Sequence, residues 1–476
     1  MGRIGELRRS LTERPLALLV GIAAASVGVI YGYDLSNIAG ALLFITDEFG
    51  LSSVQQEMVA TATVVGEIAG AVAGGWLANS IGRKKTMLLV AIAYATFALF
   101  GAASVSVSTL TAARLLLGLT IGVSVVVVPV FVAESAPAAV RGSLLVAYGL
   151  ATVIGIIAGY LITYLLADTQ NWRWMLGLAA IPAVLVALLL VRVPDTARWY
   201  LLKGRLDDAR RTLRRVEPYL DAEAELTEIA AALAEEKAES VGVLRELLRP
   251  PYLRATVFVL TLGFFIQITG INAIVYYSPR LFEMMGFTGH FGLLILPALI
   301  QVAALAAMFV SLVLIDRVGR RPILLSGIAV MVTADVILIG VFAAAPIFGG
   351  ALVAFKFCGV LLFTVGYTFG FGALVWVYAG ESLPSRLRSM GSSVMLTSDL
   401  VANAIVVGVF LTMLTALGGA ATFAVFGVLA VLSFGFVYRY APETKGRQLE
   451  DIRHFWENGG SWPAELVRSP VEPVCR

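Results

Sequence analysis

The chain has 476 residues, of which 59% are hydrophobic and only 14% are charged, and its mean hydropathy is +0.88. About a quarter of the residues of a soluble globular domain are charged, so this composition excludes an ordinary soluble domain. The net charge of +3 says little about partners, because the charges lie almost entirely in loops. Two cysteines make a disulfide scaffold unlikely, and two isolated histidines predict no histidine-based metal site. No cofactor and no nucleic-acid partner are expected.

Repeated apolar runs of about 20 residues predict an all-α membrane protein that crosses the bilayer many times. The first run follows a basic N-terminal segment and has no clear cleavage site, so it is expected to be a spanning helix and not a signal peptide. Twelve spans are predicted, at residues 16–45, 54–79, 85–104, 107–134, 143–166, 173–192, 253–281, 290–315, 321–344, 350–379, 389–415 and 418–440.

Loop charge predicts the orientation. Most Lys and Arg residues lie in the N-terminal segment, in residues 193–252, in the C-terminal tail and in the short turns on the same side. Because Lys and Arg gather in cytoplasmic loops, both termini are expected in the cytoplasm, and the protein in the plasma membrane.

Residues 193–252 differ in composition from the spans and are rich in Ala, Leu, Glu and Arg. They are expected to form short amphipathic linker helices on the cytoplasmic face. Three motifs occur twice at a nearly constant offset: Gly82-Arg83-Lys84 and Gly319-Arg320-Arg321, Glu134 with Arg141 and Glu381 with Arg388, and Pro194-Asp195-Thr196 and Pro442-Glu443-Thr444. This repeat predicts two six-helix halves, 1–192 and 253–440, joined by the linker 193–252 and followed by a tail, 441–476.

The seventh span contains two amides, Gln267 and Asn272, within the stretch 263–279. Amides at bilayer depth are costly unless they face protein or water, and a broken helix lined with them is typical of carrier binding sites. They could instead only bond to neighbouring helices. Three residues are expected to interrupt or close this helix: Gly263, Gly270 and Pro279.

Two opposite charges lie within spans of the first half, Asp34 and Arg114. An unpaired charge at this depth costs at least a few kcal/mol, so the two are expected to pair with each other. Protonation of Asp34 would release Arg114 and so link proton binding to a conformational change; a purely structural ion pair is the alternative. Three further charges interrupt spans and could pair internally: Glu67, Asp335 and Lys356.

The chain resembles the sugar porter family of the major facilitator superfamily. The motifs that carry this resemblance are GYD at 32–34, GRK at 82–84, PVFVAESAPAAVRG at 129–142, WRW at 172–174, PDTARWYL at 194–201, QITGINAIVYYSP at 267–279, DRVGRR at 316–321, Trp376 with Glu381 and Arg388, and PETKGR at 442–447. The resemblance implies the major facilitator fold, with two pseudo-symmetric halves, and transport by alternating access. It also implies that an acid at the position of Asp34 carries the proton in proton-coupled members.

The resemblance also implies the substrate-contacting positions: Gln267, Asn272, Tyr276 and Trp376. Asp399 stands at another contact position that usually holds Asn, with Asn403 one turn beyond it. Ile266, Gly149 and Ala304 replace further amides of the family pattern. These changes leave a cavity with fewer hydrogen-bonding groups and one acid, which puts a typical hexose in doubt.

Matched charges end several spans on the inner face and are interpreted as a latch between the halves: Arg83, Glu134, Arg141, Asp316, Arg320, Arg321, Glu381 and Arg388. Ion pairs that form in only one state stabilise that state. Ordinary interfacial charge explains the cations equally well, but not the repeated glutamates. Asn79 and Ser80 stand where the family has an acid and an arginine, so the N-terminal latch is expected to be the weaker one.

The predicted function is a proton-coupled symporter for a sugar or polyol in the lipid bilayer. Two alternatives stay open, an uncoupled facilitator and a proton-linked carrier of a cationic or zwitterionic metabolite that uses Asp399. A membrane-embedded hydrolase is disfavoured, because the chain has no HExxH motif and its histidines stand alone. No enzyme activity is therefore expected.

Overall fold

The computed structural model describes residues 15–136, 138–216, 221–239, 243–250, 252–348, 352–447 and 449–462. The described residues form helices and no strands. Twelve of these helices are long and apolar enough to cross a membrane, which confirms the predicted all-α fold. The predicted span edges agree with the helix ends to within a few residues.

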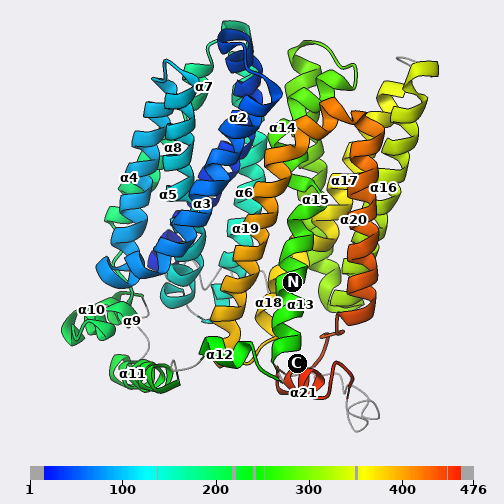
Figure 1. Ribbon diagram of the computed structural model, residues 1–476. Coiled ribbons are helices and arrows are strands. Elements are labelled where there is room, and N and C mark those ends of the chain that lie inside the picture. Colours follow the sequence, from blue (N-terminus) through cyan, green and yellow to red (C-terminus); the bar gives the residue numbers. More distant parts are fainter. Residues whose placement is uncertain are drawn as a thin grey trace. The chain divides into compact units, whose positions relative to one another are not determined.

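The first six spans lie in the blue to cyan part of the chain (Figure 1). The sixth consists of two short helices, α7 and α8. The spans are α2 (Pro15–Phe49), α3 (Ser53–Ile81), α4 (Arg83–Ala102), α5 (Val107–Ser135), α6 (Ala138–Leu166), and α7 (Trp172–Gly177) with α8 (Ala180–Val191).

Three spans of the second half depart from a plain α-helix. The seventh is broken into two helices, and the eighth and tenth each contain a π-helical turn. The spans are α13 (Leu253–Ile268) with α14 (Ile271–Met284), η2 (Phe291–Ile295) with α15 (Leu296–Val318), α16 (Arg320–Phe348), α17 (Val353–Tyr367) with η4 (Thr368–Gly372) and α18 (Ala373–Glu381), α19 (Ser385–Ala416), and α20 (Gly418–Tyr440).

Short helices form outside the spans. The expected linker helices are α9 (Ala197–Leu202), α10 (Leu206–Val216), α11 (Ala222–Glu239) and α12 (Val243–Leu247). They are amphipathic enough to build a small core of their own, around Ala197, Ala209 and Leu226. A further helix that the sequence did not predict, α21 (Leu449–Glu457), buries Trp456 against the ring of Phe258, at 5.3 Å between ring centroids.

The chain divides into two compact units. Unit 1 comprises Met1–Glu235, Ser278–Arg280 and Thr288–Ala298, and unit 2 comprises Glu236–Tyr277, Leu281–Phe287 and Leu299–Arg476. The finer division into halves, linker and tail at residues 192, 253 and 440 stays a prediction.

Within unit 1, α3 and α5 pack through facing glycines. Gly66 and Gly70 on α3, and Gly118 and Gly122 on α5, are each four residues apart, so each pair lies on one helix face. A Cβ added at Gly118 would lie 1.9 Å from the carbonyl oxygen of Thr63. Only glycine permits this approach of two backbones, and it fixes the position of α5 and hence of its charged side chain.

This packing makes Gly118→Ala destabilising. We expect the added methyl group to force α3 and α5 apart, at a cost of roughly 1–3 kcal/mol, as overpacked cores generally do. The matched control is Gly75→Ala on α3, where a Cβ meets nothing within 4 Å. Replacing a helical glycine by alanine at such an open site raises the stability of the helix by up to about 1 kcal/mol. Thermal unfolding of the two variants in detergent is the measurement. Equal unfolding midpoints would show that the contact at Gly118 does not require glycine.

Candidate transport site

The break in the seventh span lies at Gly270. Its φ of 104° is a left-handed conformation that favours glycine, and the residue begins α14. Gly263 does not interrupt the span, contrary to prediction, because its missing Cβ instead lets α13 approach the carbonyl oxygen of Met395 on α19. Pro279 does not close it either; α14 continues to Met284 with a kink at Tyr277.

The broken span packs against α19 with polar side chains paired across the contact. The side-chain amide of Gln267 on α13 lies close enough to the carboxyl of Asp399 on α19 to interact with it. Asn272 Nδ2 on α14 donates to Asn403 Oδ1 at 3.0 Å. Asp399 and Asn403 are four residues apart and so share a face of α19. The structure therefore brings together four of the six predicted substrate-contacting residues, all within unit 2.

The other two predicted contact residues are placed differently. Tyr276 is fully buried in α14, whereas Trp376 on α18 is 47% exposed. Beside Tyr276, Tyr277 donates its hydroxyl proton to the carbonyl oxygen of Val407 at 2.8 Å and thereby fixes α14 on α19. Trp376 lies in the first turn of α18, four residues after the π-helical turn η4 ends at Gly372. Such a turn changes the direction in which this part of the tenth span presents its side chains.

Two polar residues of unit 2 were missed by the sequence reasoning. Tyr367, at the end of α17, lies close enough to Asp399 to interact with its charge. Gln301 on α15 is a buried amide. It lies one turn before Ala304, which stands at the position where the family pattern has an Asn. A single amide in an apolar run is the signal that identified Gln267, and it would have found Gln301 too. Ile266 and Ala304 are themselves buried, in line with their apolar character.

In unit 1, Asp34 and Arg114 form a bidentate ion pair. The two guanidinium nitrogens of Arg114 donate to the two carboxylate oxygens of Asp34 at 2.6 and 3.0 Å. The residues are 3% and 2% exposed. Tyr94 on α4 lies beside both charges and is also buried. The expected contact is present; its role in proton coupling stays a prediction.

The predicted latch residues of the first half gather around the GRK turn. Asp195 accepts the backbone N–H groups of Arg83 at 3.0 Å and Lys84 at 3.3 Å, and so caps the start of α4. Glu134 accepts Nη2 of Arg83 at 3.0 Å and the hydroxyl of Thr196 at 2.6 Å. Burial raises the pKa of the Asp195 carboxyl, against the lowering effect of its backbone hydrogen bonds. We call Arg83, Glu134, Asp195 and Thr196 the N-terminal motif set.

The second half repeats this arrangement. Glu443 accepts the backbone N–H groups of Arg320 at 3.0 Å and Arg321 at 3.1 Å. Arg320 also pairs with Glu381 at 3.7 Å and with Asp316 at 3.2 Å. These five residues are the C-terminal motif set. The sequence repeat therefore corresponds to a repeated hydrogen-bond pattern.

Each motif set pairs within its own unit, so pairing between the halves, which a latch requires, stays a prediction. Two nitrogens of the half-buried Arg388 guanidinium, Nε and Nη2, are enclosed and have no hydrogen-bond partner among the described residues. The side chain of Arg141 lies outside the described part. The closer arginine–glutamate contact belongs to the N-terminal motif set, so the distances do not support the expectation, based on Asn79 and Ser80, that this set is the weaker one.

The remaining charges within the spans are Lys356, Asp335 and Glu67. Lys356 donates to the carbonyl oxygen of Met285 at 3.0 Å and lies 5.1 Å from the ring centre of Phe342. The carboxyl oxygens of Asp335 are buried and have no hydrogen-bond partner in the described ranges. The suggested pair of Asp335 with Lys356 is thus not formed. Glu67 is buried in α3 near Tyr148 of α6.

Comparisons with known proteins agree on one family. The model of the family described as "Sugar (and other) transporter" matches residues 20–456. The chain is 35% identical over 446 residues to the galactose-proton symporter of Escherichia coli K12, covering 94% of this chain and 95% of that protein. It is 33% identical over 449 residues to the arabinose-proton symporter of the same strain, covering 93% and 94%.

Solved structures show the same fold. The inward-open structure of the xylose transporter XylE from E. coli matches with a TM-score of 0.79 at 23% identity and covers 93% of this chain and 100% of that one. XylE with bound 6-bromo-6-deoxy-D-glucose matches with a TM-score of 0.76 at 23% identity, covering 93% and 99%. The chain belongs to the sugar transporter family.

Proposed function

We propose that this protein is a proton-coupled symporter of a sugar or polyol that works by alternating access in the plasma membrane. The observation that carries the proposal is the buried Asp34–Arg114 ion pair, at 2.6 and 3.0 Å in a family whose relatives include galactose- and arabinose-proton symporters. Both termini lie in the cytoplasm in this proposal, as the distribution of Lys and Arg in the loops favours.

The ion pair provides a two-state element. A carboxylate holds Arg114 in a fixed, bidentate geometry, which is among the strongest side-chain interactions. Once Asp34 is protonated, the attraction is lost and Arg114 must find another partner or another position. If substrate binds more tightly to the arrangement with Asp34 protonated, proton and substrate binding are coupled, and each promotes the other to the same extent.

The pairs on α13, α14 and α19 are suited to recognise hydroxyl groups. Gln267 and Asn272 flank the break at Gly270, so their amides are held by two separate helices. The amide of Asn272 donates to Asn403, and that of Gln267 lies beside Asp399. A sugar that replaces these partners exchanges one hydrogen bond for another, so the net gain per bond is about 0.5–1.5 kcal/mol. Specificity then depends on how many hydroxyls fit at once.

Asp399 favours a second candidate function, transport of a cationic or zwitterionic metabolite. It is a buried acid at a predicted contact position, and its partner there is the neutral amide of Gln267. In the described part of the chain no cationic side chain forms a salt bridge with it. A buried carboxylate without a counter-ion is costly, so this acid would be stabilised by a proton or by a positively charged substrate.

The coupling proposal predicts that Asp34→Asn abolishes uphill accumulation and leaves counterflow exchange, because an amide cannot release a proton. Proteoliposomes with an imposed pH gradient and a panel of galactose, arabinose, xylose and polyols provide the measurement. The matched control is Asp335→Asn, a buried acid of unit 2 that has no place in the coupling proposal and is expected to keep accumulation. Wild-type accumulation by Asp34→Asn would show that the pair is only structural, whereas a wild type that does not accumulate substrate uphill would support the facilitator.

The second candidate predicts opposite effects of Asp399→Asn on two ligand classes. A cationic ligand loses a charge-assisted hydrogen bond and about 1.5–3 kcal/mol of affinity, whereas a neutral sugar keeps or gains affinity. Competition binding to the purified wild type and variant distinguishes them, with Asp335→Asn again as the control. A neutral hexose that is preferred by the wild type and bound equally by the variant would rule out the cationic substrate.

A further inference from the structure

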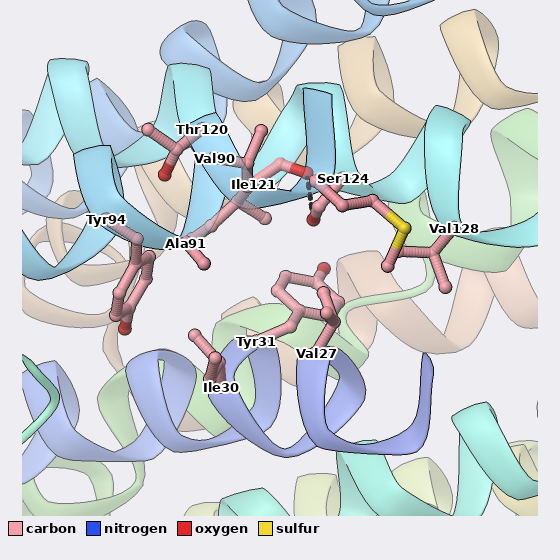
Figure 2. A pocket seen from close by; sticks show the side chains of 11 residues that line it. Val27, Ile30, Tyr31, Val90, Ala91, Tyr94, Thr120, Ile121, Ser124 and Val128 are labelled. Carbon is pink, nitrogen blue, oxygen red and sulfur yellow. Dashed lines mark hydrogen bonds between the residues drawn. The ribbon is translucent and has the colours of Figure 1, made fainter. Parts of the chain in front are cut away.

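A small pocket lies inside unit 1, between α2, α4 and α5 (Figure 2). Most of its lining is apolar, but four residues from the three helices carry hydroxyl groups: Tyr31, Tyr94, Thr120 and Ser124. A pocket with several polar groups is the kind that holds ordered water, whereas a purely apolar one stays dry.

Two of these hydroxyls are oriented so that they can accept hydrogen bonds from water. Thr120 donates its proton to the carbonyl oxygen of Leu117 and Ser124 to that of Ile121, both at 2.6 Å. A hydroxyl that donates in this way still has lone pairs for an incoming donor. Figure 2 shows the Ser124 bond and shows the Tyr31 hydroxyl directed towards Ser124 across the pocket.

The pocket reaches the Asp34–Arg114 pair at Tyr94. Tyr94 lines the pocket and lies close enough to both charges to interact with them, yet its buried hydroxyl forms no hydrogen bond of regular geometry with a described residue. Ile30, another lining residue, is one helical turn from Asp34 on the same face of α2. From Tyr94 the lining continues along α4 to Met87, one turn from Arg83 at the start of that helix.

Hydrogen bonds hold the residues that neighbour Asp34 on α2. Asn37 Nδ2 and the hydroxyl of Tyr33 both donate to the carbonyl oxygen of Met175, at 2.8 and 3.2 Å. Thr163 on α6 extends this cluster, because its hydroxyl lies 3.5 Å from the Asn37 side-chain oxygen. The groups that face Asp34 are therefore Arg114 from α5, Tyr94 from α4 and Tyr33 from its own helix.

We propose that this pocket is the proton exit route, in which water carries the proton from Asp34 past Tyr94, Thr120 and Ser124 towards the end of unit 1 that holds Arg83. The carboxyl of Asp34 gives its proton to a water molecule in the pocket, and the carboxylate left behind pairs with Arg114. The proton leaves through successive waters, so no electron transfer or further reactant is needed. This inference rests on the proposed proton symport and adds the path by which its proton is released.

The test compares net proton transport with exchange. Proteoliposomes that contain a pH-sensitive dye report the proton flux driven by the panel sugar that the wild type transports best, and counterflow of labelled sugar reports exchange, which does not require proton release. In Tyr94→Phe and Thr120→Val the ratio of proton flux to exchange should fall roughly fivefold, the rate equivalent of one lost hydrogen bond. Ala91→Leu, which fills the pocket, should lower the same ratio.

The matched control is Thr96→Val, because Thr96 lies on α4 outside the pocket and its hydroxyl donates to the carbonyl oxygen of Ile92 at 2.9 Å. It should keep the wild-type ratio. A wild type that drives protons, together with pocket variants whose ratio equals that of Thr96→Val, would overturn the exit route and leave proton symport intact. A wild type without sugar-driven proton flux would overturn both. Gel filtration of each variant identifies any that fails to fold. If Ala91→Leu fails to fold, the flux ratios of Tyr94→Phe and Thr120→Val decide the test.

Discussion

The ion pair of Asp34 with Arg114 is the interaction on which the rest of the first unit depends. Both charges are almost completely enclosed, and an isolated charge there would be strongly destabilising. Each residue therefore requires the other at hydrogen-bonding distance, on helices that are far apart in sequence. This requirement makes the pair sensitive to one proton, because a neutral Asp34 removes the attraction without removing any packing. In the proposed symport, the same pair is therefore both a structural group and a switch.

Glycine packing holds the helices that carry the pair. Gly118 lies four residues beyond Arg114 on α5 and contacts the backbone of α3. On α2, Gly32 lies two residues before Asp34 and contacts the backbone of α6, where an added Cβ would lie 1.8 Å from the carbonyl oxygen of Thr152. Such contacts are rigid because they join backbone to backbone. Rigid supports on both sides leave the side chains of the pair as the part that can change.

Much of the fold and of the charged contacts could be predicted from the sequence. The signals for them are local in the chain, or they allow only one partner. Apolar runs give the twelve spans, and Asp34 and Arg114 each need an opposite charge at bilayer depth. The duplicated motifs predict matching sets around Arg83 and Arg320, and both are present. The contact of the two amides Gln267 and Asn272 with α19 was also accessible, since amides in apolar spans require partners.

Other features depend on packing that no sequence pattern states. Gly263 and Gly270 look alike in the sequence, but one permits close packing and the other breaks the helix. Tyr94 is one of many aromatic residues in apolar spans, and only the position of α4 brings it beside Asp34. The π-helical turn before Trp376 likewise has no simple signal. The sequence therefore identifies the charged residues, and the structure identifies the residues that surround them.

In the proposed symport, substrate binding and protonation of Asp34 are linked. The most direct measurement is the proton uptake of purified protein in weakly buffered detergent solution when a transported sugar is added. Linkage is reciprocal, so sugar binding should raise the affinity of Asp34 for a proton. The wild type should therefore take up protons, and Asp34→Asn should take up none, at a sugar concentration that saturates both proteins. Sugar binding by the wild type without proton uptake, or equal uptake by Asp34→Asn, would contradict this linkage.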